Sequence, residues 1–557
     1  IGYNLSPDTD RIADDNFGLI DDITVYDLLK SQPGDLALTN VSAKALTTEA
    51  GGWMVPLQGY PSLTHGDLII DTATTGAKWV EALMAPVTTL RMTRREVFEG
   101  TGPTSGTYMR CKVGADSSGQ ITATQLYMAY EAGAYPGSPV GGGGSPRSAH
   151  KIENLLVDGY DGLCNKPKTQ SYRAPGQPQS ARAVETVMDE LAEKLGMDPM
   201  EVRLKNAVSE GDRAPTGLRH SRFGCVEVEE AMKAHPHYSA PLEGANRGRG
   251  VAIGYRMHVG GAGLSATIAV NDDGTIKLVT GSADLSGSRI ALAMRAAKAL
   301  GIAAEDVTPS VADTDSVGFT AGSFGSRITF DTGRAILTAT DEVIRQMKER
   351  AAMLWEAEPD DVDFVDGAFV RSQDRSERMT FKEMAGRLME TGGLVTCSAS
   401  DRQGDVGPQV AGNIIDVEVD PETGKVGILR YTTFMDVGQV VHRQNVEGQM
   451  QGGVLQGAGW ALNEEYFYTE DGVIANTSLL DYRMPTTLDL PMIDTVIVEV
   501  PNPRHPYGIR GVGETSIVPP LAAVANAIHD AIGVRMTSLP MSPASIRKAI
   551  NEKDGGA

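Results

Sequence analysis

Helical periodicity marks four segments of the chain, and each segment follows a loop that contains glycine. Apolar residues recur every three to four positions over 181–195, and Gly196 follows directly as a helix stop. The segments 290–300 and 331–350 and the alanine-rich run 521–532 are also expected to be helices. The preceding loops therefore end at helix N-termini, where backbone N–H groups lack partners within the helix.

Alternating apolar and polar residues predict strands that are joined by tight turns. The sequence Asp116-Ser117-Ser118-Gly119 separates two alternating runs, and Asp420-Pro421-Glu422-Thr423-Gly424 separates two more. Strands are expected at 108–115, 120–129, 247–263, 266–279, 411–419 and 426–435. The mixture of strand pairs and separate helices predicts an α+β fold, in which mixed sheets carry packed helices.

A chain of 557 residues is too long for a single hydrophobic core, and two to four domains are expected. Residues 1–85 start with an acidic, loop-like stretch and form an N-terminal segment. A polar linker rich in proline and glycine, 207–245, ends a first domain at 86–245 and precedes a second domain at 246–557. We interpret the glycine-rich stretch 133–144 as a flexible linker.

The charge and the cysteines exclude several classes of partner and metal site. Fifty Lys and Arg residues against 72 Asp and Glu residues give a formal charge of −22, which argues against nucleic acid and anionic membranes as partners. No run of about 18 apolar residues predicts a membrane span. The four cysteines form no C-x-x-C pair, so structural zinc and an iron–sulfur cluster within this chain are not expected. Scattered cysteines of this kind favour a reducing compartment, the cytoplasm.

One carboxylate stands out because of the backbone around it. Glu514 follows three glycines at 508, 511 and 513 and directly precedes the predicted helix 521–532. A carboxylate on a tight glycine turn is rigidly aimed and suits a general base. The competing interpretation is a helix-capping glutamate on a surface turn, and caps are far commoner than catalytic bases.

Three further stretches contain candidate binding groups. Tyr172-Arg173-Ala174-Pro175-Gly176 precedes one helix, and Gly281 and the tripeptide Ser286-Gly287-Ser288 precede another. Backbone N–H groups at such helix starts can hold phosphate, although an ordinary helix start with good caps has the same composition. Gly448, Gly452 and Gln456 lie on one face of a predicted helix, which suits either a flat ring or close helix packing.

In their order along the chain, these stretches resemble the molybdenum hydroxylases, the family of xanthine dehydrogenase, aldehyde oxidoreductase and carbon monoxide dehydrogenase. The resemblance is to the large molybdopterin-binding subunit, and it implies that fold. In that family the glutamate matching Glu514 is the base that activates water-derived oxygen, and the pterin rather than the protein holds the metal. The resemblance implies these cofactor-binding residues: Arg173, Ala174, Gly281, Ser286, Gly287, Ser288, Ser323, Gly325, Ser326, Arg327, Gln449, Gly511 and Gly513.

The resemblance also implies an activity and a set of partners. The expected cofactor is molybdenum–molybdopterin cytosine dinucleotide, and the expected reaction is hydroxylation of an aldehyde or an N-heteroaromatic carbon. Electrons would pass to partner subunits that carry [2Fe–2S] clusters and FAD, in a dimer of heterotrimers. The chain departs from the family pattern at Thr515, usually proline, and at Ser286-Gly287-Ser288, usually Gly-Gln-Gly; the family's Phe-Gly loop is not found. These departures leave two alternatives open: an inactive relative or assembly scaffold, and a metal-free acid–base enzyme that uses Glu514.

Overall fold

The computed structural model describes residues 92–555 except 215–216, 260–262, 286, 312–316, 318–319 and 403–404. It also describes three short strands, β1 (Leu46–Thr47), β2 (Gly52–Met54) and β3 (Ile70–Asp71). The predicted segment 1–85 therefore lies largely outside the described residues.

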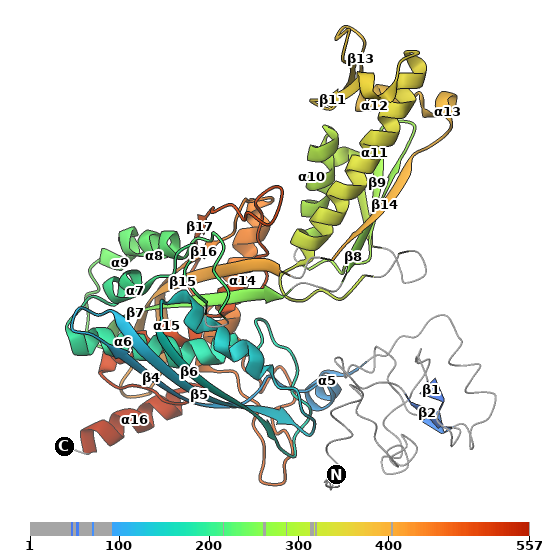
Figure 1. Ribbon diagram of the computed structural model, residues 1–557. Coiled ribbons are helices and arrows are strands. Elements are labelled where there is room, and N and C mark those ends of the chain that lie inside the picture. The colour runs from blue at the N-terminus through green and yellow to red at the C-terminus, as the bar shows by residue number, and fades with distance from the viewer. Residues whose placement is uncertain are drawn as a thin grey trace.

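A four-stranded sheet in the order β17-β16-β15-β7 forms the centre of the main body (Figure 1). Its strands are β7 (Arg247–Val259), β15 (Asp405–Val419), β16 (Val426–Asp436) and β17 (Ile493–Val498). Strand alternation sends Val251 and Ile253 into the core beneath α8 (Cys225–Ala234), while Ala252 packs on the other face beneath α15 (Pro520–Ile532). The sheet is thus covered on both faces.

Glycines on β7 let α15 lie against the strand backbone. A Cβ atom on Gly250 would lie 2.0 Å from the carbonyl oxygen of Ala523, and one on Gly248 would lie 2.3 Å from that of Ala527. Gly254 approaches Val518 and Pro519 just before the helix in the same way. Because these glycines share one face, β7 fixes the position of α15 and of the loop that leads into it.

A second sheet, in the order β10-β9-β8-β14, projects from the body in Figure 1. Helices α10 (Ser288–Leu300) and α11 (Gly333–Leu354) pack on it through a core that includes Ile268, Leu292 and Ile336. A short π-helix (Ile328–Thr332) precedes α11. The strands are β8 (Leu264–Val270), β9 (Ile276–Thr280), β10 (Val307–Val311) and β14 (Thr396–Asp401). Along the chain, β7 of the central sheet is followed by β8, and β14 is followed by β15 of the central sheet.

A third sheet, β4-β5-β6, packs against α6 and supports the loop before that helix. The stretch 133–144 is not a free linker: it runs into a 3₁₀ helix at Pro139–Ala149, and a Cβ atom on Gly143 would lie 2.3 Å from Tyr130 Oη. The flexible-linker interpretation is wrong, because Gly142 and Gly143 serve close packing against Pro175 and Tyr130. The elements are β4 (Thr107–Ala115), β5 (Ile121–Gly133), β6 (Asn154–Leu163), α6 (Gln177–Leu195) and α7 (Pro199–Asn206).

The remaining described elements lie outside these three sheets. They are α5 (Arg94–Gly100), α9 (Pro236–Ser239), β11 (Val362–Val365), β12 (Ala368–Arg371), β13 (Arg378–Thr380), α12 (Phe381–Ala385), α13 (Leu388–Thr391), α14 (Arg443–Leu462) and α16 (Pro543–Gly555), with 3₁₀ turns at Ala304–Asp306, Pro359–Asp361 and Thr515–Ile517. In the part of the chain that the structure describes, no helix has the length and apolar character needed to cross a membrane.

The structure confirms the α+β fold with mixed sheets, since β9–β10 and β16–β17 are parallel pairs within otherwise antiparallel sheets. The helix predicted at 181–195 begins earlier, at Gln177, because Gly176 is left-handed and Pro178 is tolerated in a first helical turn. The helix predicted at 290–300 likewise begins at Ser288. The domain boundary at 245 stays a prediction.

Candidate functional site

A cavity of about 1000 Å³, called here the main cavity, is lined by residues of β7 and α14 in the body and by residues of α10 and of the stretch before α11 in the projecting part. Most of its lining comes from five separate stretches, within 170–177, 285–291, 323–329, 437–456 and 509–514. Stretches up to 340 positions apart in sequence are in direct contact here. The loops that the sequence singled out thus converge on one cavity.

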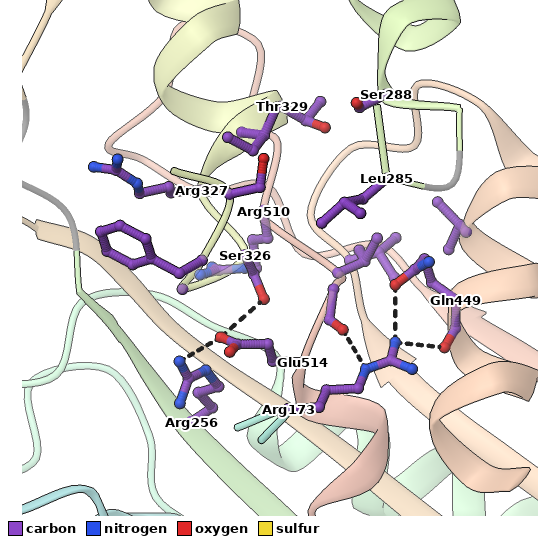
Figure 2. A pocket seen from close by; sticks show the side chains of 18 of the residues that line it. Arg173, Arg256, Leu285, Ser288, Ser326, Arg327, Thr329, Gln449, Arg510 and Glu514 are labelled. Atoms are coloured by element: carbon purple, nitrogen blue, oxygen red, sulfur yellow. Dashed lines mark hydrogen bonds and ion pairs between the residues drawn. The ribbon is translucent and has the colours of Figure 1, made fainter. Parts of the chain in front are cut away.

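Glu514 reaches this cavity from the loop before the 3₁₀ turn, and three groups hold its carboxylate. Two of them, Ser326 and Arg256, are shown in Figure 2. The backbone N–H of Ala174 donates to Oε1 at 3.3 Å, and Ser326 Oγ lies 3.5 Å from Oε2. Arg256 forms an ion pair with Oε2. The Glu514 side chain makes no capping hydrogen bond to the turn that follows it, so the helix-cap interpretation is wrong.

The three glycines before Glu514 serve different purposes. Gly508 has φ +67°, a left-handed conformation that favours glycine. Gly511 is needed for close approach, because a Cβ atom there would lie 1.6 Å from the carbonyl oxygen of Ser326. Gly513 lines the cavity and has room for a Cβ atom at 3.4 Å from Ser326 Oγ. Close packing at Gly511 therefore holds the loop 508–514, called here the base loop, against the 323–327 loop.

Arg173 joins this base loop to α14. Its Nε donates to the carbonyl oxygen of Gly513, and Nη1 donates to Gln456 Oε1 at 3.0 Å. Its Nη2 donates to both Oε1 and the carbonyl oxygen of Gln449, at 2.8 and 2.9 Å. Burial lowers the pKa of Arg173, while nearby Glu514 acts in the opposite direction. Arg173 and Gln449 both line the cavity, as expected, and here they position each other.

Arg256 is a site residue that the sequence reasoning missed. It lies on β7, and its Nη1 donates to Gln177 Oε1 at 2.6 Å while Nη2 contacts Glu514. Burial lowers the pKa of Arg256, and the carboxylate of Glu514 opposes that shift. The only signal in the sequence was a lone arginine at the end of the apolar run 251–255. Gln177 lies within the 172–179 motif but is not among the site residues predicted from the sequence.

Two further loops, 281–288 and 323–327, bring most of their predicted residues to the cavity. The predicted residues of the 281–288 and 323–327 loops that line the cavity are Gly287, Ser288, Ser323, Gly325, Ser326 and Arg327. Ala174, Gly281 and Gly511 do not line it: Ala174 bonds to Glu514, and Gly281 packs against Thr320, where a Cβ atom would meet the side chain at 2.9 Å. Ser286 lies outside the described residues.

Arg327 combines a buried charge with an aromatic contact. Its guanidinium lies 4.3 Å from the ring centre of Phe324, and Nη1 lies 3.7 Å from Asp331 Oδ2 in the π-helix. Burial raises the pKa of Asp331 to about 7, although the Arg327 charge acts to lower it. The pair brings a fully buried cation to the cavity wall.

The glycine-rich helix α14 uses its two faces differently. A Cβ atom on Gly453 would lie 2.0 Å from Ser516 Oγ, and one on Gly457 would lie 2.5 Å from Pro520 Cβ. These glycines therefore serve close packing against the segment after Glu514. At Gly452 a Cβ atom would meet only Arg173 Nη1, at 3.8 Å, so this position belongs to the side that carries Gln449 and Gln456. Gly448 is exposed, and a Cβ atom there would meet no atom outside its own helix backbone within 4 Å.

The cavity wall is cationic although the chain is acidic. Among the described residues it carries Arg173, Arg256, Arg327 and Arg510 against the single carboxylate of Glu514. Asp436, behind the wall, offsets Arg510 at 2.9 Å. Such a wall suits a ligand with phosphate groups. Within the described ranges, no group of three His, Cys, Asp or Glu residues could hold a metal ion, so a metal in this cavity would need ligands of its own.

Comparison with known families agrees with this geometry. Two models described as molybdopterin cofactor-binding domains match residues 75–207 and 227–491. The chain is 30% identical over 475 residues to the xanthine dehydrogenase molybdenum-binding subunit of Escherichia coli O157:H7, a match over 81% of this chain and 63% of that protein. The chain belongs to the molybdenum hydroxylase family. Its resemblance is to the large, molybdopterin-binding subunits.

Other members of the molybdenum hydroxylase family give a similar picture. The aldehyde oxidoreductase of Megalodesulfovibrio gigas is 29% identical over 487 residues, which cover 83% of this chain and 51% of that protein. The crystal structure of quinoline 2-oxidoreductase from Pseudomonas putida 86 superposes with a TM-score of 0.76 at 26% identity, over 83% of this chain and 64% of that one. The chain thus spans between about half and two thirds of the length of these relatives.

Proposed function

We propose that the main cavity holds a molybdenum–molybdopterin cofactor and that the chain is the catalytic subunit of a hydroxylating oxidoreductase. The residues fit this group on three counts: the cavity is large, its wall is cationic, and the described residues offer no protein ligand set for a bare metal. Arg327, Ser288 and Gln449 would contact the cofactor. When bound, the cofactor would accept the two electrons that leave the substrate.

Glu514 carries the proposal, because it is the one carboxylate at the wall among the described residues and its direction is fixed by Ala174, Ser326 and Arg256. Hydroxylation with oxygen from water releases two protons and two electrons, and a base beside the reacting oxygen must take the first proton. The Arg256 guanidinium and the Ala174 N–H both contact the carboxylate and fix its direction. Glu514 is thus aimed into the cavity from a fixed position, as a general base must be.

The substrate class follows from the relatives, whose names include xanthine dehydrogenase, aldehyde oxidoreductase and quinoline 2-oxidoreductase. We infer an aldehyde or an N-heteroaromatic compound with an electron-poor carbon. The basic wall favours the cytosine dinucleotide form of the cofactor, which carries an additional phosphate. The scattered cysteines favour electron transfer to partner subunits with [2Fe–2S] clusters and FAD, within a cytoplasmic dimer of heterotrimers.

The test replaces Glu514 by Gln in the intact complex and follows dye-linked oxidation of aldehydes and N-heteroaromatics. We expect the molybdenum content to stay unchanged and turnover to fall by at least 10³-fold, as when a base essential to the chemical step is removed. Glu470→Gln, at an exposed turn, is the matched control and should retain full turnover. Retained turnover in Glu514→Gln would refute the assignment of the base. A molybdenum-loaded wild-type complex without any turnover would favour a binding or assembly role.

A further inference from the structure

A second cavity, of about 360 Å³, lies beside the main cavity. Gln170, Ser171 and Tyr172 line both spaces, so these three residues form a shared wall. The second cavity contains none of the residues assigned above to the cofactor or to the base. The proposed redox reaction therefore does not explain which ligand the second cavity would bind.

Aromatic rings form much of the wall of this second cavity. Tyr172 and Trp460 meet edge to face with ring centres 5.4 Å apart. Tyr466 and Tyr482 lie 5.8 Å apart, and the buried ring of Phe98 supports both from behind, at 5.5 and 5.1 Å. These contacts hold the rings in place before any ligand enters. The faces and edges of fixed rings can bind a flat group or a cation.

The charge of the second cavity is opposite to that of the main cavity. Its lining has the carboxylates of Glu131, Glu464 and Glu465 and one cation, Lys166. Lys166 lies 2.7 Å from Glu131 and 4.8 Å from the ring centre of Tyr468, so this cation is already neutralised. Glu464 and Glu465 form no ion pair with any of the described residues. The wall thus keeps two uncompensated carboxylates beside aromatic rings.

Glu464 is the better placed of these two carboxylates. Tyr482 Oη donates a hydrogen bond to its Oε2 at 2.8 Å, which fixes the side chain next to the aromatic wall. Burial raises the pKa of Glu464, and the Tyr482 hydrogen bond only partly offsets this. A bound cation would stabilise the ionised form. Glu464 therefore gains more from a positively charged ligand than an exposed carboxylate would.

We propose that the second cavity binds an organic monocation, such as a protonated or quaternary amine on a small flat or methylated body. The aromatic rings contact the body and the cationic centre, and Glu464 and Glu465 supply the opposite charge. A hydrated inorganic cation lacks the apolar surface that these rings would cover. The proposal is independent of the redox function, since it uses none of the residues that act in the main cavity.

Calorimetric titration of the full chain with N-methylpyridinium tests the proposal, with neutral toluene, which has the same size, and the slightly larger anionic benzoate as control probes. We expect one N-methylpyridinium per chain, bound at least tenfold more tightly than either control. Glu464→Gln should weaken this binding at least tenfold, and Glu470→Gln should leave it unchanged. Affinity should rise with pH and then level off, because only ionised Glu464 attracts the cation.

Two results would overturn the proposal. The first is equal binding of N-methylpyridinium and toluene, or binding that Glu464→Gln and Glu465→Gln leave unchanged, provided that both variants melt at the wild-type temperature. The second is loss of binding in Glu514→Gln with full binding in Glu464→Gln, which would place the cation in the main cavity. Loss in Glu464→Gln with retention in Glu514→Gln would support the second cavity.

Discussion

Arg256 and Glu514 form an ion pair in which the two side chains are only 7% and 13% exposed. One partner comes from β7, the edge strand of the central sheet, and the other from the loop before α15, so the pair joins the sheet to the base loop (Figure 2). A charge that is buried this deeply is costly when it stands alone. This relationship leads to the first two predictions.

Removing one partner of the pair should cost more than removing both. We expect Glu514→Gln to lower the free energy of unfolding by about 3 kcal/mol, because it leaves the buried Arg256 charge without its counterion. Adding Arg256→Met should restore at least about 1 kcal/mol of this loss. Urea denaturation of the two single variants and the double variant measures the coupling. Strictly additive losses would mean that the two charges do not interact.

Arg256 should also affect the proposed reaction, because it holds the Glu514 carboxylate in position. Arg256→Met removes this ion pair, so kcat should fall by about ten- to a hundredfold through misplacement of the carboxylate. Arg256→Lys keeps a positive charge and should lose less activity. The measurement is kcat and KM for both variants. An unchanged kcat in Arg256→Met would contradict the role given to this residue.

Two glycines in the base loop should respond differently to the same substitution. Gly511→Ala places a methyl group against the Ser326 carbonyl and should destabilise the protein by about 1 to 3 kcal/mol while moving the base loop. Gly513→Ala has room for the methyl group and should change stability by less than about 0.5 kcal/mol. Thermal melting of both variants checks this. Equal effects at the two positions would contradict the observed packing.

The sequence predicted the loops that line the site far better than the residues that hold those loops in place. Glu514, Arg173 and Gln449 stood in short motifs with helices beside them, and the structure brings all three to one cavity. Arg256 could not be found in this way, because its partner is 258 positions away and only the register of β7 turns it toward Glu514. Contacts of this kind depend on tertiary packing, which local sequence patterns do not predict.

The structural role of glycine was the hardest feature to predict from the sequence. The stretch 133–144 has the composition of a linker, yet Gly143 packs against Tyr130. The absence of a side chain gives a chain freedom or lets it approach another group closely, and composition cannot distinguish these two uses. On α14 the same two uses occur: Gly453 packs closely against Ser516, whereas a Cβ atom on Gly448 would point into open space.

A buried acid away from the site should make stability depend on pH. Burial, with the nearby Glu185 carboxylate, raises the pKa of Glu229 to about 8. The unfolded chain releases this proton near pH 4.5 while the folded chain keeps it, so the free energy of unfolding should fall as pH rises from about 5 to 8. Glu229→Gln cannot ionise and should flatten this slope. Urea denaturation across this pH range gives the comparison, and parallel slopes in wild type and variant would contradict it.

The most direct test of the central claim is to measure what the main cavity contains. The full chain, purified from a host that makes molybdenum cofactors, should yield about one molybdenum, one pterin and one cytidine nucleotide per chain on acid denaturation. Arg327→Met should lose most of this content, and Glu514→Gln should keep it. A folded wild-type chain that contains neither molybdenum nor pterin would contradict the account.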